Sequence, residues 1–351
     1  MKTPDCAWRL ADLKDVPQNG LKVMSTFACG GGSSMGYKRA GCSIVAANDI
    51  DPEMAWHYKQ NLNPPNYFLC PIRDLLTADL PPEIFNLDIL DGSPPCSTFS
   101  MAGSREKAWG KDKHFREGQA KQVLSDLFFD YLDLVERLKP RVAIAENVKG
   151  MILGNAKGYT KMVMARFKEI GYRPQLFLIN GADCGVPQRR ERVFFVAIRD
   201  DIKVPPLKLA PKHRWISAGE ATADLQMLTD DEIRDTSPTK ERARLYPMTK
   251  EGESMAGACM KLKGKGNFFT TTRVDRSAPS CTITSGRDVV YHWDQCRRLS
   301  FRELKRLGSF PDDYEAKTDK IGKYMIGMSV PPKMTEVVAR AVIDQWLQPK
   351  P

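Results

Sequence analysis

The first candidates for chemistry are a cysteine and a glutamate that each follow a short apolar run. Cys96 ends the segment Asp91–Cys96, which comes directly after the run Leu87–Leu90. Glu146 comes directly after the run Val142–Ala145. Runs of this kind are typical of buried strands, and parallel strands bring their carboxyl ends to one edge of a sheet. We therefore expect Cys96 and Glu146 to lie at the same edge.

The surroundings of Cys96 favour a nucleophile over a packing residue. A lone cysteine is usually a small buried hydrophobe. Here Pro94 and Pro95 fix the backbone before it, and polar residues follow it. A thiolate and a carboxylic acid are what conjugate addition to a pyrimidine ring requires, because the thiolate attacks carbon 6 while the acid donates to N3. Glu146 alone would be more typical of a structural residue, and its interest lies in sharing an edge with Cys96.

A glycine-rich turn, Phe27–Gly36, follows the earliest apolar run and can bring backbone N–H groups close to a ligand. Asp49 ends the next predicted strand, about 20 residues further on, where a carboxylate can hold the hydroxyl pair of a ribose. The turn does not fit the G-x-G-x-x-G pattern of nicotinamide cofactors, because the last glycine position, counted from Gly30 and Gly32, holds Met35. A different nucleoside is therefore expected.

These groups need a sheet to position them, and strands and helices alternate through the first part of the chain. The predicted strands are Leu21–Ala28, Ser43–Asn48, Leu87–Leu90 and Val142–Ala145. Between the last two, apolar residues recur at helical spacing from Leu124 to Leu138, and Pro140 closes the helix. Gln175–Asn180 and Val193–Ile198 look like a late hairpin. The alternation predicts an α/β fold with a doubly wound, mostly parallel sheet.

A second, smaller domain is expected where this alternation stops. Residues 201–296 are rich in Pro, Lys, Asp and Gly and show weak periodicity, so we predict an irregular domain there. Regular structure resumes at Arg297, and Pro332–Leu347 carries the apolar stripe of a helix. The predicted division is residues 1–200 plus 297–351 for the larger domain and 201–296 for the smaller one.

Composition narrows the class of protein. The chain has 351 residues, of which 42% are hydrophobic, so a sizeable core can be buried. No apolar stretch approaches the roughly 18 residues of a membrane span, and the N-terminal residues lack a signal-peptide core, so a cytoplasmic protein is expected. Nine cysteines without a Cys-x-x-Cys pair and four scattered histidines suggest neither disulfides nor a metal site. The net charge of +10 favours an anionic partner such as nucleic acid.

The full set of motifs resembles that of the DNA cytosine-5 methyltransferases. The segments that carry the resemblance occur in the order of the family's motifs. They are Phe27–Gly36, Pro94–Cys96, Glu146–Val148, Gln188–Arg192, Arg297–Pro311 and Gly327–Val330. The resemblance covers about 21–199 and 297–348. It implies a Rossmann-like, S-adenosylmethionine-dependent methyltransferase fold with a target-recognition domain at about 201–296. It also implies methyl transfer from S-adenosylmethionine to carbon 5 of cytosine in double-stranded DNA.

The resemblance implies a role for individual residues as well. Cys96 would be the nucleophile, Glu146 would act at N3 of a flipped cytosine, and Arg190 and Arg192 would hold the catalytic loop and the base, with Arg192 near the cytosine O2. The residues implied for cofactor binding are Phe27, Gly31, Gly32, Asp49, Ile50, Ile72 and Ser329. The residues expected to contact DNA, some of them candidates from residue type alone, are Ser100, Arg105, Gln188, Lys263, Lys265, Thr271 and Arg273.

The chain departs from the family pattern at four positions. Cys29 stands where the family usually has Gly, and Ser97 replaces the usual Gln after the nucleophile. Pro71 sits where an Asp normally contacts the adenine amino group, and Met328 replaces the usual Asn before Ser329. These changes leave the nucleophile and the acid in place. Together they raise the hypothesis of weaker or altered donor binding.

Other functions remain open from the sequence. An RNA cytosine-5 methyltransferase of the same fold is one alternative, and a DNA-binding protein that has lost catalysis is another. The second domain favours duplex DNA over RNA, and the presence of Cys96, Glu146 and Arg192 argues against lost catalysis. A monomer is expected, and a cognate restriction endonuclease is a candidate partner. No membrane association and no metal are expected.

Overall fold

A computed structural model of the chain describes residues 4–95, 112–113, 122–123, 127–154, 156–225, 227–264, 266–286 and 290–347. Two compact units make up the chain, and each is described by itself. The sheet unit comprises Leu13–Ile179, Glu191–Pro211 and Thr335–Pro351. The second unit comprises Met1–Asp12, Asn180–Arg190 and Lys212–Met334. Among the described helices, none is long and apolar enough to cross a membrane.

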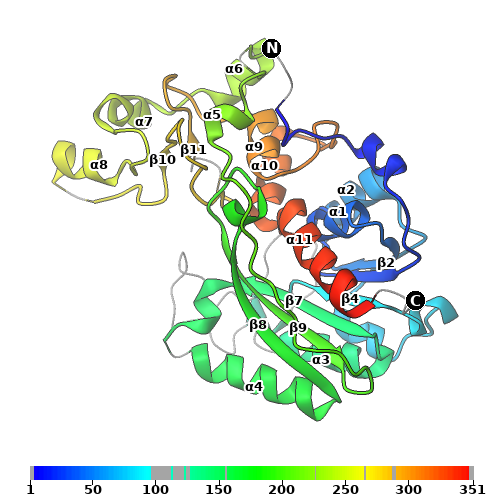
Figure 1. The fold of residues 1–351 in the computed structure, drawn as a ribbon. Coiled ribbons are helices and arrows are strands. Elements are labelled where there is room, and N and C mark those ends of the chain that lie inside the picture. The colour runs from blue at the N-terminus through cyan, green and yellow to red at the C-terminus, as the bar shows by residue number, and fades with distance from the viewer. Residues whose placement is uncertain are drawn as a thin grey trace. The chain divides into compact units, whose positions relative to one another are not determined.

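A seven-stranded sheet forms the centre of the sheet unit (Figure 1). Its strand order is β3-β2-β1-β4-β7-β9-β8, with parallel pairing from β3 through β7 and antiparallel pairing between β7 and β9. The strands are β1 (Lys22–Thr26), β2 (Ser43–Asp49), β3 (Asn66–Leu69), β4 (Ile89–Gly92), β7 (Val142–Val148), β8 (Tyr172–Asn180) and β9 (Glu191–Arg199). The predicted mostly parallel, doubly wound sheet is confirmed.

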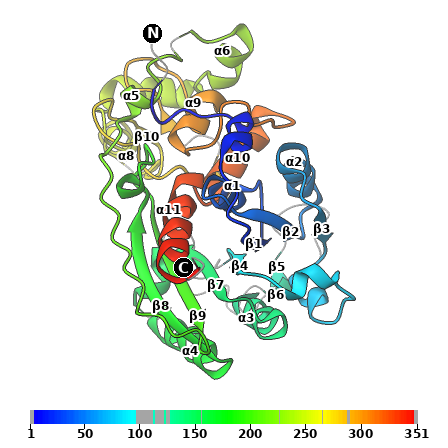
Figure 2. The same cartoon turned by 45° about the vertical axis from the view of Figure 1, so that its right-hand side comes forward.

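Helices cover both faces of this sheet, as Figures 1 and 2 show. On one face, α3 and α4 pack with sheet residues such as Leu90, Ala145 and Phe195 in one hydrophobic cluster. On the other face lie α1, α2 and the part of α11 that belongs to this unit. The helices are α1 (Gly32–Arg39), α2 (Pro52–Leu62), α3 (Leu127–Leu138), α4 (Ala156–Glu169) and α11 (Pro332–Val342), which runs on as a π-helix (Ile343–Leu347). The predicted helices ending near Leu138 and Leu347 are confirmed.

Short elements complete the sheet unit. Two-residue strands β5 (Asp112–Lys113) and β6 (Gln122–Val123) form a separate antiparallel pair. Among the described residues, 3₁₀ turns occur at Leu10–Asp15, Ile72–Leu76, Pro82–Phe85 and Lys149–Ile152, and in the second unit at Gly181–Cys184 and Tyr246–Met248. The first of these begins in the second unit and ends in the sheet unit.

The order of the strands reverses between β1 and β4, where two neighbouring carboxyl ends leave the sheet together. Thr26 pairs with Gly92, and Gly92 pairs with Ala145. A Cβ at Gly92 would lie 2.6 Å from the ring of Tyr131 and 2.8 Å from the hydroxyl of Thr26, so only glycine fits there without displacement. In sheets of this kind ligands bind at such a reversal. The ends of β1 and β4, with Ala145 of β7 beside them, therefore define the candidate ligand-binding edge.

The second unit is built from short elements. Its helices are α5 (Ala218–Ala221), α6 (Asp230–Thr236), α7 (Lys240–Leu245), α8 (Ala256–Lys263), α9 (Phe301–Leu307) and α10 (Asp319–Met328). Two strands of two residues each, β10 (Thr272–Arg273) and β11 (Val290–Tyr291), pair in parallel. The irregular character expected for 201–296 agrees with these short elements.

The boundaries of the second unit differ from the predicted 201 and 296. Gln188, in the connection between β8 and β9, donates to the carbonyl of Leu307 (3.2 Å) and accepts from the N–H of Ile283 (3.0 Å). Trp8 donates to the carbonyl of Ser309 (2.9 Å). These contacts join distant segments to α9, and local periodicity carries no sign of them. Whether the unit recognises a DNA target stays a prediction.

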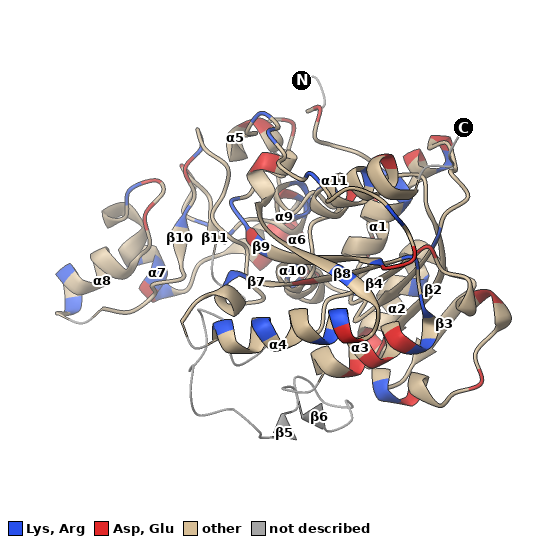
Figure 3. Ribbon diagram, turned by 60° about the horizontal axis from the view of Figure 1, so that its bottom comes forward, with Lys and Arg blue, Asp and Glu red and all other residues tan. Residues whose placement is uncertain are grey.

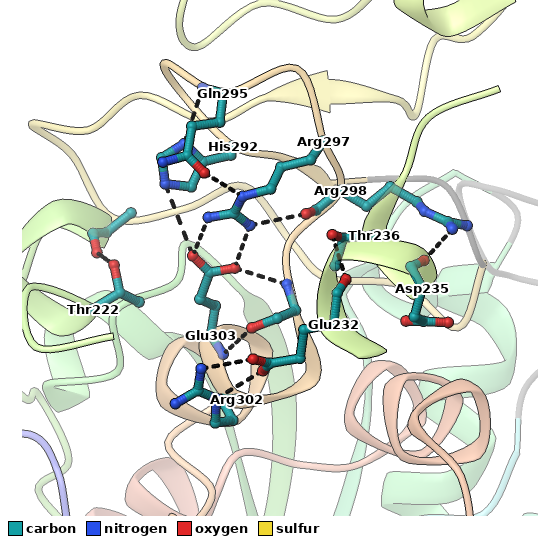
Figure 4. A network of polar contacts seen from close by, with 12 residues as sticks. Thr222, Glu232, Asp235, Thr236, His292, Gln295, Arg297, Arg298, Arg302 and Glu303 are labelled. Atoms are coloured by element: carbon teal, nitrogen blue, oxygen red, sulfur yellow. Dashed lines mark hydrogen bonds and ion pairs between the residues drawn. The ribbon is translucent and has the colours of Figure 1, made fainter. Parts of the chain in front are cut away.

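A buried polar network holds the middle of the second unit together (Figure 4). Arg297 donates to both oxygens of Glu303, at 2.8 and 2.9 Å, and Glu303 is 2% exposed. Glu303 also completes a capping box with Ser300 at the start of α9. Arg302 pairs with Glu232 of α6 at 2.7 Å. The network ties α9 to the segment that follows β11 and to α6.

Replacing one member of this network is expected to destabilise the second unit. In Glu303→Gln, the buried Arg297 keeps its charge and loses its carboxylate, which we expect to cost about 3 kcal/mol. Urea unfolding followed by intrinsic fluorescence measures the change. Glu253→Gln, at an exposed site of the same unit, is the matched control. Equal midpoints for the two variants would contradict the importance of the network.

Candidate active site

Glu146 and Arg192 form a largely enclosed ion pair at the ligand-binding edge. Strand β7 extends past the end of β4, and Val148 pairs with Arg192 on the antiparallel strand β9. Glu146 and Val148 are two positions apart in the strand, so Glu146 and Arg192 share a face, and Nε of Arg192 lies 2.9 Å from Oε1 of Glu146. Their side chains are 10% and 14% exposed. Burial lowers the pKa of Arg192, and the charge of Glu146 opposes that shift.

Asn147 fixes the chain that leads to Cys96. Its side-chain amide donates to the carbonyl of Pro94 at 2.9 Å, and its oxygen accepts from the N–H of Val148. The segment after β4 is thereby held beside Glu146 up to Pro94. Our sequence analysis gave Asn147 no role, although it stands directly beside Glu146 in a motif. Four predicted site residues lie outside the described residues: Cys96, Ser100, Arg105 and Lys265.

The glycine-rich turn after β1 has an unusual backbone. Phe27, Cys29 and Gly31 have φ angles of 52°, 46° and 83°. A Cβ at Gly31 would lie 2.3 Å from Cδ1 of Leu62, so glycine is needed there for space as well as for its φ angle. Gly32 begins α1. Cys29 therefore has a left-handed backbone conformation, which is uncommon for a residue with a side chain. This conformation explains why the family usually has glycine at this position.

The Asp49 carboxylate is oriented by main-chain donors. Its Oδ2 accepts from the N–H of Cys29 at 2.7 Å, and its Oδ1 accepts from the N–H of Asp51 at 2.9 Å. Burial raises the pKa of Asp49, and these backbone hydrogen bonds oppose the shift. Each carboxylate oxygen has a further lone pair. The side chain is therefore suited to accept from the two hydroxyls of a ribose.

The other predicted cofactor residues of the sheet unit differ in exposure. Phe27 and Ile50 are partly exposed. Ile72 is 3% exposed and belongs to the main hydrophobic cluster. Phe27 packs against the same cluster. The turn, Asp49 and Ile50 thus come together at the ends of β1 and β2, while Ile72 offers little open surface.

A buried acid that our sequence analysis overlooked lies at the same edge. Asp91, in β4, is 3% exposed and accepts from the hydroxyls of Ser25 (2.9 Å) and Tyr37 (3.0 Å). Burial, reinforced by the charge of Glu146, raises the pKa of Asp91 to about 7, although hydrogen bonds from Ser25 and Tyr37 oppose the shift. Tyr37 belongs to α1, so Asp91 links the helix after the glycine-rich turn to the strand that leads to Cys96.

Three predicted residues come together inside the second unit. Arg190, which is 2% exposed, donates to the carbonyls of Ile283 (2.8 Å), Gly327 (3.0 Å) and Ser329 (3.0 Å). Gln188 is 1% exposed and accepts from the N–H of Ile283. These contacts stabilise the fold of the unit. The predicted roles of Arg190 in holding the catalytic loop, of Gln188 on DNA and of Ser329 at the cofactor stay predictions.

The remaining predicted DNA contacts of the second unit differ in their exposure to solvent and in their hydrogen-bond partners. Thr271 is buried. Arg273 donates to the carbonyls of Trp293 (2.7 Å) and Thr249 (2.8 Å), and its guanidinium lies 4.5 Å from the centre of the Tyr246 ring. Lys263 is exposed and forms an ion pair with Glu241. Of these three, Lys263 is exposed, Arg273 is partly exposed and Thr271 is buried.

Comparison with known proteins identifies the family. The model of the C-5 cytosine-specific DNA methylases matches residues 21–344. The chain is 29% identical over 343 residues to the type II methyltransferase M.NgoFVII of Neisseria gonorrhoeae, covering 93% of this chain and 87% of that protein. It is 27% identical over 349 residues to M.FnuDI of Fusobacterium nucleatum, covering 92% and 94%. The chain belongs to the C-5 cytosine-specific DNA methylase family, and it is a DNA cytosine-5 methyltransferase.

Solved structures have the same fold. One is a DNA modification methyltransferase encoded within an E. coli prophage, with a TM-score of 0.70 and 19% identity over 93% of this chain and 99% of that one. Another is a DNMT2 variant from Spodoptera frugiperda, with a TM-score of 0.65 and 17% identity over 92% and 100%. The fold is that of an S-adenosylmethionine-dependent methyltransferase, as predicted.

The backbone of Cys29 leads to a prediction about stability. A non-glycine residue at positive φ is strained by about 1 kcal/mol. We expect Cys29→Gly to leave the free energy of unfolding unchanged or to raise it by up to about 1 kcal/mol. Cys29→Val is the contrasting variant, because a branched Cβ is least tolerated at this φ angle. Thermal unfolding of both variants tests this, and equal losses would argue against strain at Cys29.

The raised pKa of Asp91 predicts a pH dependence. Its folded pKa of about 7 lies above its ordinary value, so the folded state keeps a proton that the unfolded state loses between about pH 4 and 7. Asp91 therefore costs stability as the pH rises through that window. Asp91→Asn should become more stable than the original chain towards pH 8, by about 2 kcal/mol, with a difference that shrinks towards pH 4.

Urea unfolding at a series of pH values measures this effect. Asp74→Asn, at an exposed carboxyl group of the same unit, is the control and should show no such trend. A parallel pH profile for Asp91→Asn and the original chain would mean that Asp91 is ionised in both states.

Proposed function

We propose that the enzyme transfers a methyl group from S-adenosylmethionine to carbon 5 of cytosine in double-stranded DNA, with Cys96 as nucleophile and Glu146 as acid. The observation that carries this proposal is the 2.9 Å ion pair of Glu146 with Arg192 beside the segment that leads to Cys96. Asn147 adds support, because it holds Pro94, two residues before Cys96. Family membership supports the reaction, and these contacts support the assignment of residues.

The proposed steps follow from the chemistry of the pyrimidine ring. The Cys96 thiolate adds to carbon 6 while Glu146 gives a proton or hydrogen bond to N3, which makes carbon 5 electron-rich. Carbon 5 takes the methyl group, then loses its proton to a base, and the Cys96 sulfur leaves carbon 6. The target base must first leave the duplex stack, as in other enzymes that act on a base.

Arg192 has two tasks in this proposal. Its guanidinium orients the Glu146 carboxyl group through the Nε contact. Its remaining N–H donors, apart from Nη1, which donates to the carbonyl of Glu191, are suited to the cytosine O2. A positive group near the edge also favours the thiolate form of a neighbouring cysteine. Arg190, with its three carbonyl partners, is proposed to act by positioning the segment that carries Arg192.

S-adenosylmethionine supplies a methyl group on a positively charged sulfur, which an electron-rich carbon can accept. We assign its ribose to Asp49, whose two oxygens are fixed by main-chain donors and keep lone pairs in reserve. Gly31 and Gly32, at the start of α1, are proposed to line the cofactor pocket, because a helix N-terminus offers main-chain N–H groups to a ligand. Phe27, Ile50 and Ile72 are proposed to contact the adenine, and Ser329 is proposed as a further cofactor-binding residue. The departures at Pro71 and Met328 bear on donor affinity.

Recognition of the target is assigned to the second unit. The proposal keeps 201–296 as the target-recognition part and the rest of the chain as the catalytic part. Ser100, Arg105 and Lys265 are proposed DNA contacts outside the described residues, and exposed Lys263 is another. The similar proteins M.NgoFVII and M.FnuDI bear the name type II methyltransferase, so we propose a restriction–modification setting with a cognate endonuclease as partner.

Nucleoside mass spectrometry tests the proposal. Mixed-sequence duplex DNA and, separately, RNA are incubated with the protein and S-adenosylmethionine. We expect 5-methylcytosine in DNA, no turnover for Cys96→Ser with DNA binding retained, and a loss of about 10²–10³-fold for Glu146→Gln. Glu191→Gln, at an exposed glutamate of the same hairpin, is the matched control.

Each result has a defined meaning. Product from Cys96→Ser at the original rate would remove Cys96 from its role. Equal rates for Glu146→Gln and Glu191→Gln would remove Glu146. Methylation of RNA alone would replace DNA as the substrate.

A further inference from the structure

One tenth of the chain carries half of its net charge. Residues 240–273 contain eight Lys and Arg against three Asp and Glu, a net charge of +5 out of +10 for the whole chain. The segment includes α7, α8 and β10, and Figure 3 shows the basic positions on α7 and α8. Its own small hydrophobic cluster, which includes Leu245, Tyr246 and Met255, holds it together. This basic segment belongs entirely to the second unit.

An apolar surface stands in the middle of these charges. Phe269 is 71% exposed and Met260 is 52% exposed. A Cβ at Gly266 would lie 2.8 Å from Cζ of Phe269 and 3.4 Å from Cε of Met260, so both side chains cover Gly266. We call Met260, Gly266 and Phe269 the α8 patch. An exposed aromatic ring of this kind marks an interaction site more often than a scattered apolar residue does.

The turn that carries Phe269 is strained and anchored. Phe268 has a φ angle of 62°, a costly conformation for a large side chain. Its N–H donates to Oδ1 of Asn267 (2.7 Å), and its carbonyl accepts from the N–H of Thr271 (3.0 Å). Its ring packs against the small cluster, with the guanidinium of Arg242 at 4.9 Å. Strain kept in place by surrounding contacts is typical of functional sites, and here it turns Phe268 inward and leaves Phe269 outward.

The polar residues first expected to contact DNA do not form this surface. Thr271 is 3% exposed, and Arg273 donates to two carbonyls of the same unit. The side chains that the segment presents to solvent include Phe269 and Met260, with Lys261 and Lys263 on the same helix as Met260. The exposed surface therefore combines apolar and basic groups.

We propose that the α8 patch is a contact surface for duplex DNA, in which Phe269 packs against a base or sugar in a groove while Lys261 neutralises a phosphate. The inference rests on the proposed function and names a residue that function did not include. The net charge of +5 around the patch complements a polyanion. Apolar side chains that press between or against bases, flanked by basic groups, are a known means of gripping DNA.

Salt dependence separates the two kinds of contact. Fluorescence anisotropy with a labelled mixed-sequence duplex gives the Kd at several salt concentrations. Phe269→Ala should weaken binding about tenfold at every salt concentration without changing the slope of log Kd against log salt, because it neutralises no phosphate. Phe269→Trp should restore affinity, since its ring also stacks. Lys261→Ala should reduce the slope by about 0.9.

The control is another exposed apolar residue of the same unit. Met227 is 88% exposed and lies outside the basic segment, so Met227→Ala should change neither Kd nor slope. Unchanged melting temperatures establish that the variants are folded. Phe269→Ala with the affinity of the original chain, or Phe269→Trp as weak as Phe269→Ala, would overturn the proposal.

Two further measurements distinguish the patch from the reaction. If Phe269→Ala binds DNA weakly but the original chain makes no 5-methylcytosine, the patch stands and the proposed function fails. If methylation proceeds with the same KM for DNA in both proteins, the patch fails and the function stands. Vesicles containing phosphatidylserine test a membrane as the occupant, and a loss confined to vesicles in Phe269→Ala would overturn DNA as the partner.

Discussion

Glu146 is a carboxyl group in a largely enclosed place, and it depends on β9 running antiparallel to β7. A charged group removed from water needs a partner, and removing one member of such a pair leaves the other uncompensated. The antiparallel register puts Arg192 opposite Val148 and so within reach of Glu146. If β9 ran parallel to β7, Arg192 at its start would lie at the opposite end of the sheet from Glu146. The antiparallel pairing of β9 with β7, beside five parallel strands, thus gives the charged Glu146 its partner at this edge.

The same edge brings the glycine-rich turn, the segment that leads to Cys96 and the Glu146–Arg192 pair close together. The ends of β1 and β4 are in register with Ala145 of β7, so the turn at Phe27, the segment at Pro94 and the Glu146 pair are neighbours through the main chain alone. Asp91 and Tyr37 add a side-chain link from β4 to α1. A change in the packing of α1 would therefore alter the position of the segment that leads to Cys96.

Much of the fold could be predicted from sequence because buried parallel strands are uniform apolar runs. The runs at Ser43–Asn48 and Val142–Ala145 were found in this way, and the helix ending at Leu138 was marked by its spacing and by Pro140. Strand β3 is short, and none of its four residues is buried, so it differs from the long buried runs that mark the other parallel strands. The compact second unit extends beyond 201–296 because Gln188 and Trp8 join it through contacts far apart in the chain.

Residue types indicated which chemistry a side chain can perform, but they did not indicate where in the fold that side chain points. Gln188–Arg192 is a polar stretch, yet Arg190 turns inward to three carbonyls while Arg192 meets Glu146. Thr271 and Arg273 have the right groups for base edges, and their contacts lie within the unit. Asp91 was passed over because one acid at the end of an apolar run gives no sign of its partners. Such distinctions depend on tertiary neighbours, which spacing does not encode.

The support of Asp49 by the N–H groups of Cys29 and Asp51 has a consequence for how this turn can diverge. Every residue except proline carries that donor, so the carboxylate keeps its orientation whatever side chain occupies position 29. The limit on position 29 is conformational: a residue there must tolerate a φ angle near 46°. Substitutions at position 29 are therefore limited by the backbone conformation and not by the chemistry of the side chain. A residue other than the usual glycine at this position does not indicate that the Asp49 site has been lost.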